Sequence, residues 1–202
     1  MFQVALTLLA AFLLGSIPTA YVLARLAKDT DIRRSGSGNV GALNAYRQLG
    51  KRAGVLVLAL DAGKGALAVY LGMILDVPNV VVYGAAILAT LGHNFSPFLN
   101  FRGGRGAATV LGISMVALLS ITLISMGFGA IVFAATRHAP WSILGVFVLL
   151  NALTIATAQS AGLISLCLVL SMVVGGTYLW RRYPHISSAL RHRQWRRLMT
   201  IE

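Results

Sequence analysis

Long apolar runs separated by short polar segments dominate this sequence. An α-helix of about 18 to 20 apolar residues is long enough to cross the hydrocarbon core of a membrane. Because backbone groups inside a bilayer must be paired within the chain, such runs predict membrane helices and an all-α fold. Seven helices are expected, over residues 2–24, 54–75, 80–92, 107–124, 125–136, 140–158 and 160–180.

The region 107–135 is open to two interpretations: one long tilted span, or two short helices broken near Gly127 and Gly129. Lys and Arg in short loops favour the cytoplasmic side of a membrane. Only the second interpretation places every basic segment on one side, so we expect two helices here and an amino terminus outside. The cytoplasmic segments are then residues 25–52, 102–105, 137 and 181–197.

Some of these helices are shorter than a bilayer is thick. We expect residues 80–92 and the two halves of 107–136 in the protein interior or along a cavity, where broken helices are tolerated. Pro18 lacks a backbone N–H and is expected to kink the first helix near Gly15 and Ser16, a motif that we assign to packing. The prediction is a single integral membrane domain over residues 1–202, a polytopic bundle of about seven helices.

Composition supports this fold class and limits the partners. Apolar residues make up 57% of the chain and charged residues 11%, against about 25% charged in soluble proteins. The net charge of +12 is typical of proteins that meet anionic lipid, anionic substrates or nucleic acid. Because the basic residues lie at the ends of apolar runs, we expect contact with membrane lipid and none with nucleic acid. A lone cysteine, Cys167, excludes a disulfide framework and a thiolate metal site within the chain.

The long loop after the first apolar run is rich in glycine. Its glycines fit the pattern GxGxxG, but a dinucleotide site would need a preceding strand and a crossover helix, which this chain does not predict. Glycines at these places let backbone N–H groups turn toward one anion, whereas a merely topogenic loop would need only the arginines. We interpret the loop as a phosphate cradle formed by Gly36, Gly38 and Gly41, with side-chain donors from Ser37, Asn39, Asn44 and Arg47.

A second glycine-rich loop leads directly into a predicted helix. Backbone N–H groups at a helix amino terminus favour anions, so this segment predicts another anion site. His93 could act as a general base or bond a backbone carbonyl. Phe95, Phe98 and Phe101 could seat the loop at the membrane interface or border an acyl chain. The residues of the anion site are Arg102, Gly103, Gly104, Arg105 and Gly106.

The second apolar run contains two charged residues, Asp61 and Lys64. Ions inside a membrane are costly and usually functional. At i and i+3 the two form either a mutually neutralised structural pair, or a unit in which Lys64 reaches a phosphate while Asp61 holds it in place. The chain has only five acidic residues, which offers neither a carboxylate cluster for a metal nor a Ser–His–Asp arrangement. We therefore expect no metal and no cofactor.

At these motifs the sequence resembles the bacterial acylphosphate-dependent glycerol-3-phosphate acyltransferases, small polytopic enzymes of phospholipid synthesis. The family's GSGNxGATN followed by Arg resembles residues 36–44 with Arg47, its DxxKG resembles 61–65, and its GHxxxxFxxFxGGKG resembles 92–106. The span pattern agrees over the whole chain.

The sequence departs from the family pattern at several positions. Leu43 stands where Thr is usual, and Arg105 where Lys is usual, which keeps the charge but changes its geometry. Arg137 with Ser142 resembles an RxxS-type stretch of looser spacing. The family's carboxyl-terminal motif, HxxNIxRL, fits less well. When the motif is aligned on Arg197 and Leu198, this chain has Gln194 in place of Asn and Trp195 in place of Ile, and His192 lies one position away from the motif's His.

The resemblance implies transfer of a fatty acyl group from acyl phosphate to the 1-hydroxyl of glycerol 3-phosphate, by a monomer in a bacterial cytoplasmic membrane. It implies catalytic roles for Ser37, Arg47, Lys64, His93 and Arg105. The alternatives are a transporter or channel for a phosphorylated anion, which also needs Arg and Gly at broken helices, and a lipid-binding protein without activity. Substrate-binding roles are implied for Gly36, Gly38, Asn39, Gly41, Asn44, Asp61, Arg102, Gly103, Gly104, Gly106, Arg137, Ser142, His192, Gln194 and Arg197.

Overall fold

The computed structural model describes the backbone of residues 1–191 and the side chains of residues 1–183. Over this part of the chain the protein is helical and contains no strand, which confirms the all-α membrane bundle. Five helical segments are long and apolar enough to cross a membrane. These are Phe2–Lys28, Lys51–Ile74, Leu119–Thr136, Ala139–Ala156 and Ala161–Tyr183.

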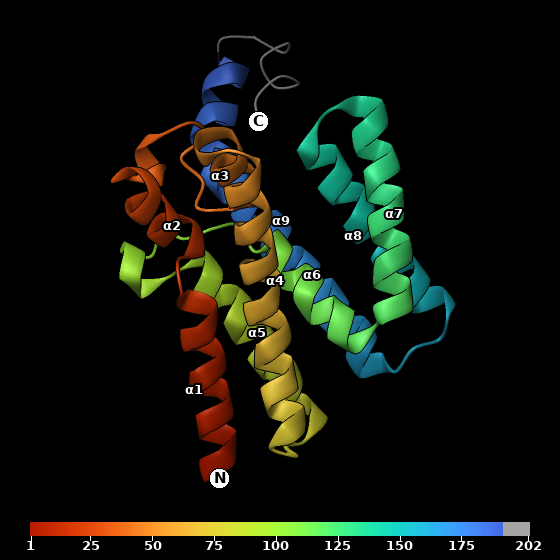
Figure 1. Cartoon of the computed structure of the whole chain (residues 1–202). Helices are drawn as coiled ribbons and strands as arrows, with labels where there is room; N and C mark the ends of the chain where they lie inside the picture. Colours follow the sequence, from red (N-terminus) through yellow and green to blue (C-terminus); the bar gives the residue numbers. More distant parts are fainter. Residues whose placement is uncertain (192–202) are drawn as a thin grey trace.

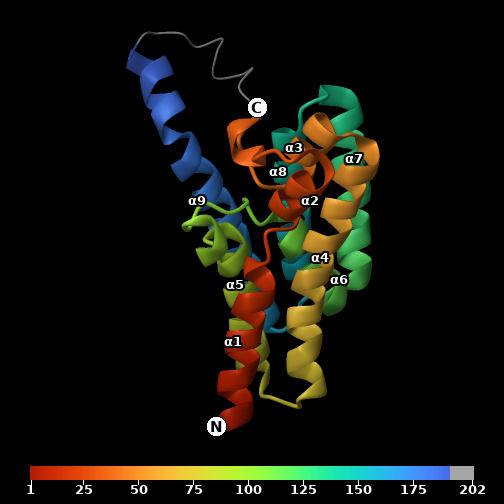
Figure 2. The ribbon, with the colours of Figure 1, turned by 60° about the vertical axis from the view of Figure 1, so that its left-hand side comes forward.

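The helices form an elongated bundle in which α1, α4 and α5 run side by side, and α7 and α8 form a hairpin next to α6 (Figures 1 and 2). Two 3₁₀ turns, η1 (Ile32–Arg34) and η2 (Pro97–Leu99), lie in the connecting loops. The α-helices are α1 (Phe2–Ser16), α2 (Thr19–Lys28), α3 (Ala42–Leu49), α4 (Lys51–Ile74), α5 (Asn79–Asn94), α6 (Ala107–Ala117), α7 (Leu119–Thr136), α8 (Ala139–Ala156) and α9 (Ala161–Arg191).

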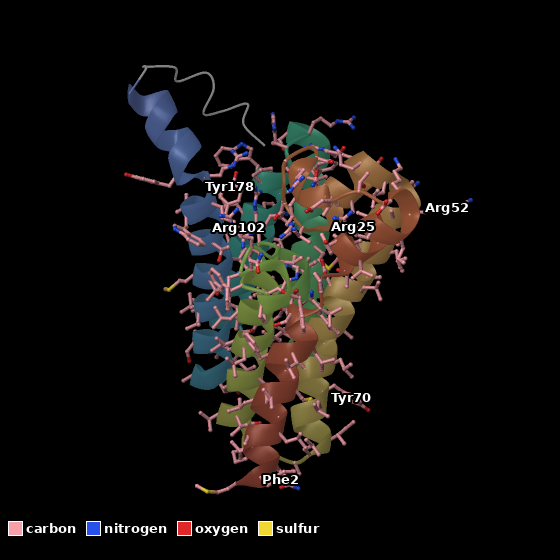
Figure 3. All side chains as sticks on the ribbon, turned by 90° about the vertical axis from the view of Figure 1, so that its left-hand side faces the viewer. Phe2, Arg25, Arg52, Tyr70, Arg102 and Tyr178 are labelled. Carbon is pink, nitrogen blue, oxygen red and sulfur yellow. The ribbon has the colours of Figure 1, made fainter. Side chains whose placement is uncertain are left out.

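The basic segments gather at one end of the bundle. Figure 3 shows Arg25, Arg52 and Arg102 toward the end opposite Phe2. The α4–α5, α6–α7 and α8–α9 connections lie toward the amino-terminal end instead (Figure 1). The charge pattern predicted this separation of basic connections from connections without Lys or Arg. That the basic end faces the cytoplasm stays a prediction.

The predicted helix break near Gly127 and Gly129 is wrong. The break lies at Leu118, whose backbone is not helical (φ −147°, ψ 57°), and α7 continues through both glycines as a membrane-length helix. Gly129 serves packing instead: a Cβ there would overlap Val146, and Ser142 on α8 donates a hydrogen bond to its carbonyl (2.7 Å). A glycine that admits a neighbouring helix and a glycine that ends a helix look alike in sequence.

The first apolar run is also divided, because the kink expected near Pro18 is a complete break. α1 ends at Ser16, Ile17 takes an extended ψ of 116°, and α2 begins at Thr19. Pro18 disfavours helical backbone at the residue before it, which explains the position of the break. The helices α2 and α3 flank the first glycine-rich loop. The start of α2 was expected only as the end of the helix over residues 2–24, and α3 was not among the seven expected.

Close packing at small residues brings the site together. A Cβ at Gly15 of α1 would overlap the carbonyl of Ala89 on α5, and a Cβ at Gly65 of α4 would overlap the carbonyl of Thr109 on α6. Small residues allow membrane helices to approach this closely because they have almost no side chain in the way. Such close packing matters in lipid, where no hydrophobic force drives helices together. As a result α1, α4, α5 and α6 meet around the polar residues of α4.

Candidate active site

A buried carboxylate on α4 organises side chains from three helices. Oδ1 of Asp61, whose side chain is 1% exposed, accepts a hydrogen bond from Thr19 Oγ1 at 2.6 Å and lies 2.9 Å from Lys64 Nζ. His93 Nδ1 on α5 lies 3.6 Å from the same oxygen. A carboxylate therefore does face His93, although no acidic residue is near it in sequence. Thr19 was missed, because it gains this role only where α2 meets α4.

Lys64 also closes the break between α1 and α2. Its Nζ donates a hydrogen bond to the carbonyl of Ile17 at 2.9 Å. This carbonyl follows the end of α1, where carbonyl groups have no N–H partner within the helix. The two charges of the Asp61–Lys64 pair therefore neutralise each other, and Lys64 also lines the pocket described below. Contact between Lys64 and a phosphate stays a prediction. The Pro18 motif, assigned to packing from the sequence, contributes directly to this site.

The loop between α5 and α6 folds back over His93. The N–H of Gly103 donates to the carbonyl of Asn94 (3.1 Å), and the N–H of Gly104 donates to the carbonyl of His93 (2.9 Å). A Cβ on Gly104 would overlap His93 Nε2, so only glycine allows this approach. The start of the loop is tied to α1 by Ser96 Oγ, which donates to the carbonyl of Ser16 at 2.6 Å.

A small pocket opens between the helix break, the two glycine-rich loops and α4. Its wall combines the ammonium of Lys64 and the imidazole of His93 with apolar side chains and glycine backbone. One cationic side chain and one imidazole thus lie next to apolar groups and loop backbone. The lining residues are Ile17, Pro18, Thr19, Val40, Lys64, His93, Ser96, Leu99, Gly103 and Gly104.

Asn44 holds the first glycine-rich loop in its turned shape. Its Nδ2 lies within hydrogen-bond distance of the carbonyls of Ile32, Ser35 and Asn39, at 2.9 to 3.2 Å, and its Oδ1 accepts from the N–H of Ser37. Asn44 was predicted as a substrate ligand, but the loop backbone occupies its amide. The geometry thus gives Asn44 a positioning role.

The remaining predicted residues of this loop surround that centre. Gly36 and Gly38 have positive φ (+58° and +68°), which L-residues rarely adopt, and Gly41 precedes α3. Ser37 and Arg47 are exposed at the basic end, where a soluble substrate could reach them. Asn39 Oδ1 is buried without a hydrogen-bond partner among the described atoms.

The two glycine-rich loops contact each other. Arg33 pairs with Asp31 (2.8 Å) and donates to the carbonyl of Leu99 at 3.4 Å, which joins the first loop to η2. The guanidinium of Arg33 lowers the pKa of Asp31 from 3.8 to about 2. The two predicted anion sites are therefore neighbours in space, which the sequence did not establish.

Arg105 is held by α9. Its guanidinium carbon lies 4.8 Å from the ring centroid of Tyr178, and that of Arg182 lies 5.2 Å from the same centroid. Burial lowers the pKa of Arg105 from its ordinary value. Arg102 is exposed. Sequence reasoning attributed the basic residues of α9 to topology and did not find Tyr178, since nothing in the sequence pairs it with Arg105.

A family model described as glycerol-3-phosphate acyltransferase matches residues 5–192. The chain belongs to this family. It is 46% identical over 156 residues to glycerol-3-phosphate acyltransferase 2 of Moorella thermoacetica, covering 67% of this chain and 80% of that protein. It is 41% identical over 174 residues to a glycerol-3-phosphate acyltransferase of Synechococcus sp., covering 86% and 84%.

Solved structures give the same result. The chain is similar to crystal structures of PlsY, an integral membrane glycerol 3-phosphate acyltransferase, in its glycerol 3-phosphate form (TM-score 0.83, 29% identity) and in its lysophosphatidic acid form (TM-score 0.80, 27% identity). Each match covers 94% of this chain and 93% of the other. The family resemblance seen in the motifs is confirmed.

Two residues predicted for the acyltransferase site do not line this pocket, and three others lie outside the described part. Neither Arg137 nor Ser142 lines the pocket: Arg137 ends α7 with a positive φ of +58°, and Ser142 joins α8 to α7. His192, Gln194 and Arg197 lie outside the described residues. Within the described residues, no three metal-ligating side chains lie together.

Proposed function

We propose that this family member transfers a fatty acyl group from acyl phosphate to the 1-hydroxyl of glycerol 3-phosphate, giving lysophosphatidic acid and inorganic phosphate. The observation that carries the proposal is the pocket in which Lys64 and His93 lie beneath the backbone of Gly103 and Gly104. The relatives named as glycerol-3-phosphate acyltransferases support the acceptor. The choice of acyl phosphate as donor rests on the sequence resemblance.

The reaction depends mainly on the positions of the two substrates and on stabilisation of the negative charge that develops. The hydroxyl oxygen of glycerol 3-phosphate attacks the acyl carbonyl, a new C–O bond forms, and the bond from the acyl carbon to the phosphate oxygen breaks. The donor is already activated, so holding two phosphates in the right geometry and stabilising the developing negative charge supply most of the catalysis. We assign one glycine-rich loop to each phosphate, with Ser37 and Arg47 on the first and Arg105 on the second.

A phosphate oxygen of the substrate takes the hydroxyl proton in this proposal. The position of His93 supports such substrate assistance, because Nδ1 faces Asp61 and Nε2 lies under the backbone of Gly104. Lys64, fixed by Asp61 and Ile17, stabilises negative charge in the pocket.

The protein acts as a monomer in the bacterial cytoplasmic membrane, with the amino terminus outside. A reporter fused after Glu202 tests that orientation.

The test is phosphate release from palmitoyl phosphate by the purified protein in detergent, with and without glycerol 3-phosphate. We expect release that depends on glycerol 3-phosphate and is matched by lysophosphatidic acid. A transporter, a channel or a lipid-binding protein would release no phosphate in either condition. Arg105→Met should reduce the rate, whereas Arg25→Met, which removes an exposed arginine paired with Asp29, should not.

A further inference from the structure

One turn of α9 contacts the loop between α5 and α6, and Arg181 forms its main polar link. The guanidinium donates through Nη1 to the carbonyl of Gly103 and through Nη2 to the carbonyl of Asn94, the latter at 2.6 Å. Hydrogen bonds from a charged donor are roughly twice as strong as neutral ones. Arg181 therefore joins α9 to two backbone segments at once.

Those two segments form the turn that covers His93. The carbonyl of Asn94 also accepts the N–H of Gly103, and the next pair joins the N–H of Gly104 to the carbonyl of His93. A guanidinium that bonds the carbonyls of both Asn94 and Gly103 holds the two sides of this turn together. The backbone of Gly104 then stays over the imidazole of His93.

The same turn of α9 also places Arg105. Tyr178, whose ring lies 4.8 Å from the Arg105 guanidinium carbon, precedes Arg181 by three residues, so the two side chains share one face of α9. Arg105 follows Gly104 directly in the chain. A displacement of the turn at Gly103 and Gly104 would therefore carry Arg105 away from its place beside Tyr178.

We propose that Arg181 is a positioning residue for acyl transfer. By binding the carbonyls of Gly103 and Asn94 it presets the glycine turn and Arg105 for a substrate phosphate, so that binding does not have to order the loop. This inference rests on the proposed function for its kinetic consequence. Its structural consequence, a turn ordered by α9, can be measured without turnover.

The experiment compares full-length Arg181→Met and Arg181→Lys with the wild type in detergent. We expect faster hydrogen–deuterium exchange in Arg181→Met at the amides of residues 103 and 104, which are bonded to Asn94 and His93. We also expect KM for a phosphate substrate to rise about tenfold or more, with a smaller change in kcat. Arg181→Lys, which keeps the charge without the fork of donors, should lie between.

Two control variants separate this role from general stability. Arg25→Met removes another arginine from the basic end, and Thr177→Val removes the α9 hydroxyl that accepts from Asn94 Nδ2 at 2.9 Å while leaving Arg181 in place. Both should keep wild-type exchange at residues 103 and 104. The inference is overturned if exchange there is unchanged in Arg181→Met, or if Thr177→Val produces the same exchange and KM. A wild-type protein without transferase activity would reject the proposed function, and the exchange result would still decide the role of Arg181.

Discussion

The imidazole of His93 lies directly beneath Gly104. The N–H of Gly104 donates to the backbone carbonyl of His93 at 2.9 Å, and a Cβ on residue 104 would overlap Nε2 of the ring. His93 is thus enclosed, with Asp61 facing one ring nitrogen and loop backbone covering the other. This relationship explains why a glycine stands at position 104 and limits what His93 can do in catalysis.

Gly104→Ala should therefore disturb the site, although the substitution adds only one methyl group and no charge. We expect kcat/KM for acyl transfer to fall at least about tenfold, because either the imidazole or the loop must move and small misplacements of catalytic groups are costly. Gly63→Ala is the matched control, since a Cβ there meets nothing within 4 Å, and it should keep activity. Wild-type kcat/KM in Gly104→Ala would show that the close approach is dispensable.

Asp61 and Lys64 should behave as one unit in unfolding. Lys64→Met leaves a buried carboxylate without its cation and the carbonyl of Ile17 without that donor, which should cost about 3 to 5 kcal/mol of stability. The double variant Asp61→Asn with Lys64→Met removes both charges and should lose less than Lys64→Met alone. Thermal unfolding in detergent measures both.

Lys28→Met is the control for that comparison, since Lys28 is exposed and donates only to the carbonyl of Gln48 among the described contacts. Its effect on stability should stay below about 1 kcal/mol. Additive losses from Asp61→Asn and Lys64→Met would contradict the coupling of the two charges.

His93→Ala should slow the reaction only modestly if the substrate supplies the base. Loss of a protein general base usually lowers kcat by about 10² to 10⁴-fold. We expect a fall of less than about 10²-fold in single-turnover acyl transfer, reflecting a less ordered loop. A larger fall, with loss of the acidic limb of the pH–rate profile, would assign the proton to His93 instead, because a general base is inactivated when it is protonated at low pH.

The Asp31–Arg33 pair predicts a pH dependence of stability. Arg33 lowers the pKa of Asp31 from 3.8 to about 2, so the carboxylate stabilises the folded state fully above pH 3.8, and this contribution disappears as the pH falls through 2. Asp31→Asn should lower stability at pH 7 by at most about 2 kcal/mol. The difference from wild type should shrink below about pH 4, as thermal unfolding at several pH values would show. An equal difference at pH 7 and pH 2 would contradict this linkage.

Local sequence features predicted much of the architecture and some of the site. Apolar run length gave the membrane helices, and glycines interleaved with basic and polar residues marked the two loops. The break at Leu118 escaped prediction because no glycine or proline stands there, whereas Gly129 mimicked a break while serving helix packing. The role of Asn44 escaped for a similar reason: an amide that bonds loop carbonyls looks, in sequence, like one that awaits a ligand.

By itself, therefore, the sequence determined the membrane class, the two phosphate-binding candidates and the family, because these depend on composition and on short contiguous motifs. Only the tertiary structure decided that Asp61 faces His93, that Lys64 binds the broken end of α1, and that α9 holds the second loop through Arg181. The physical reason is separation along the chain. Each of these contacts joins residues 32 to 78 positions apart, whose meeting depends on how closely small residues let the helices pack.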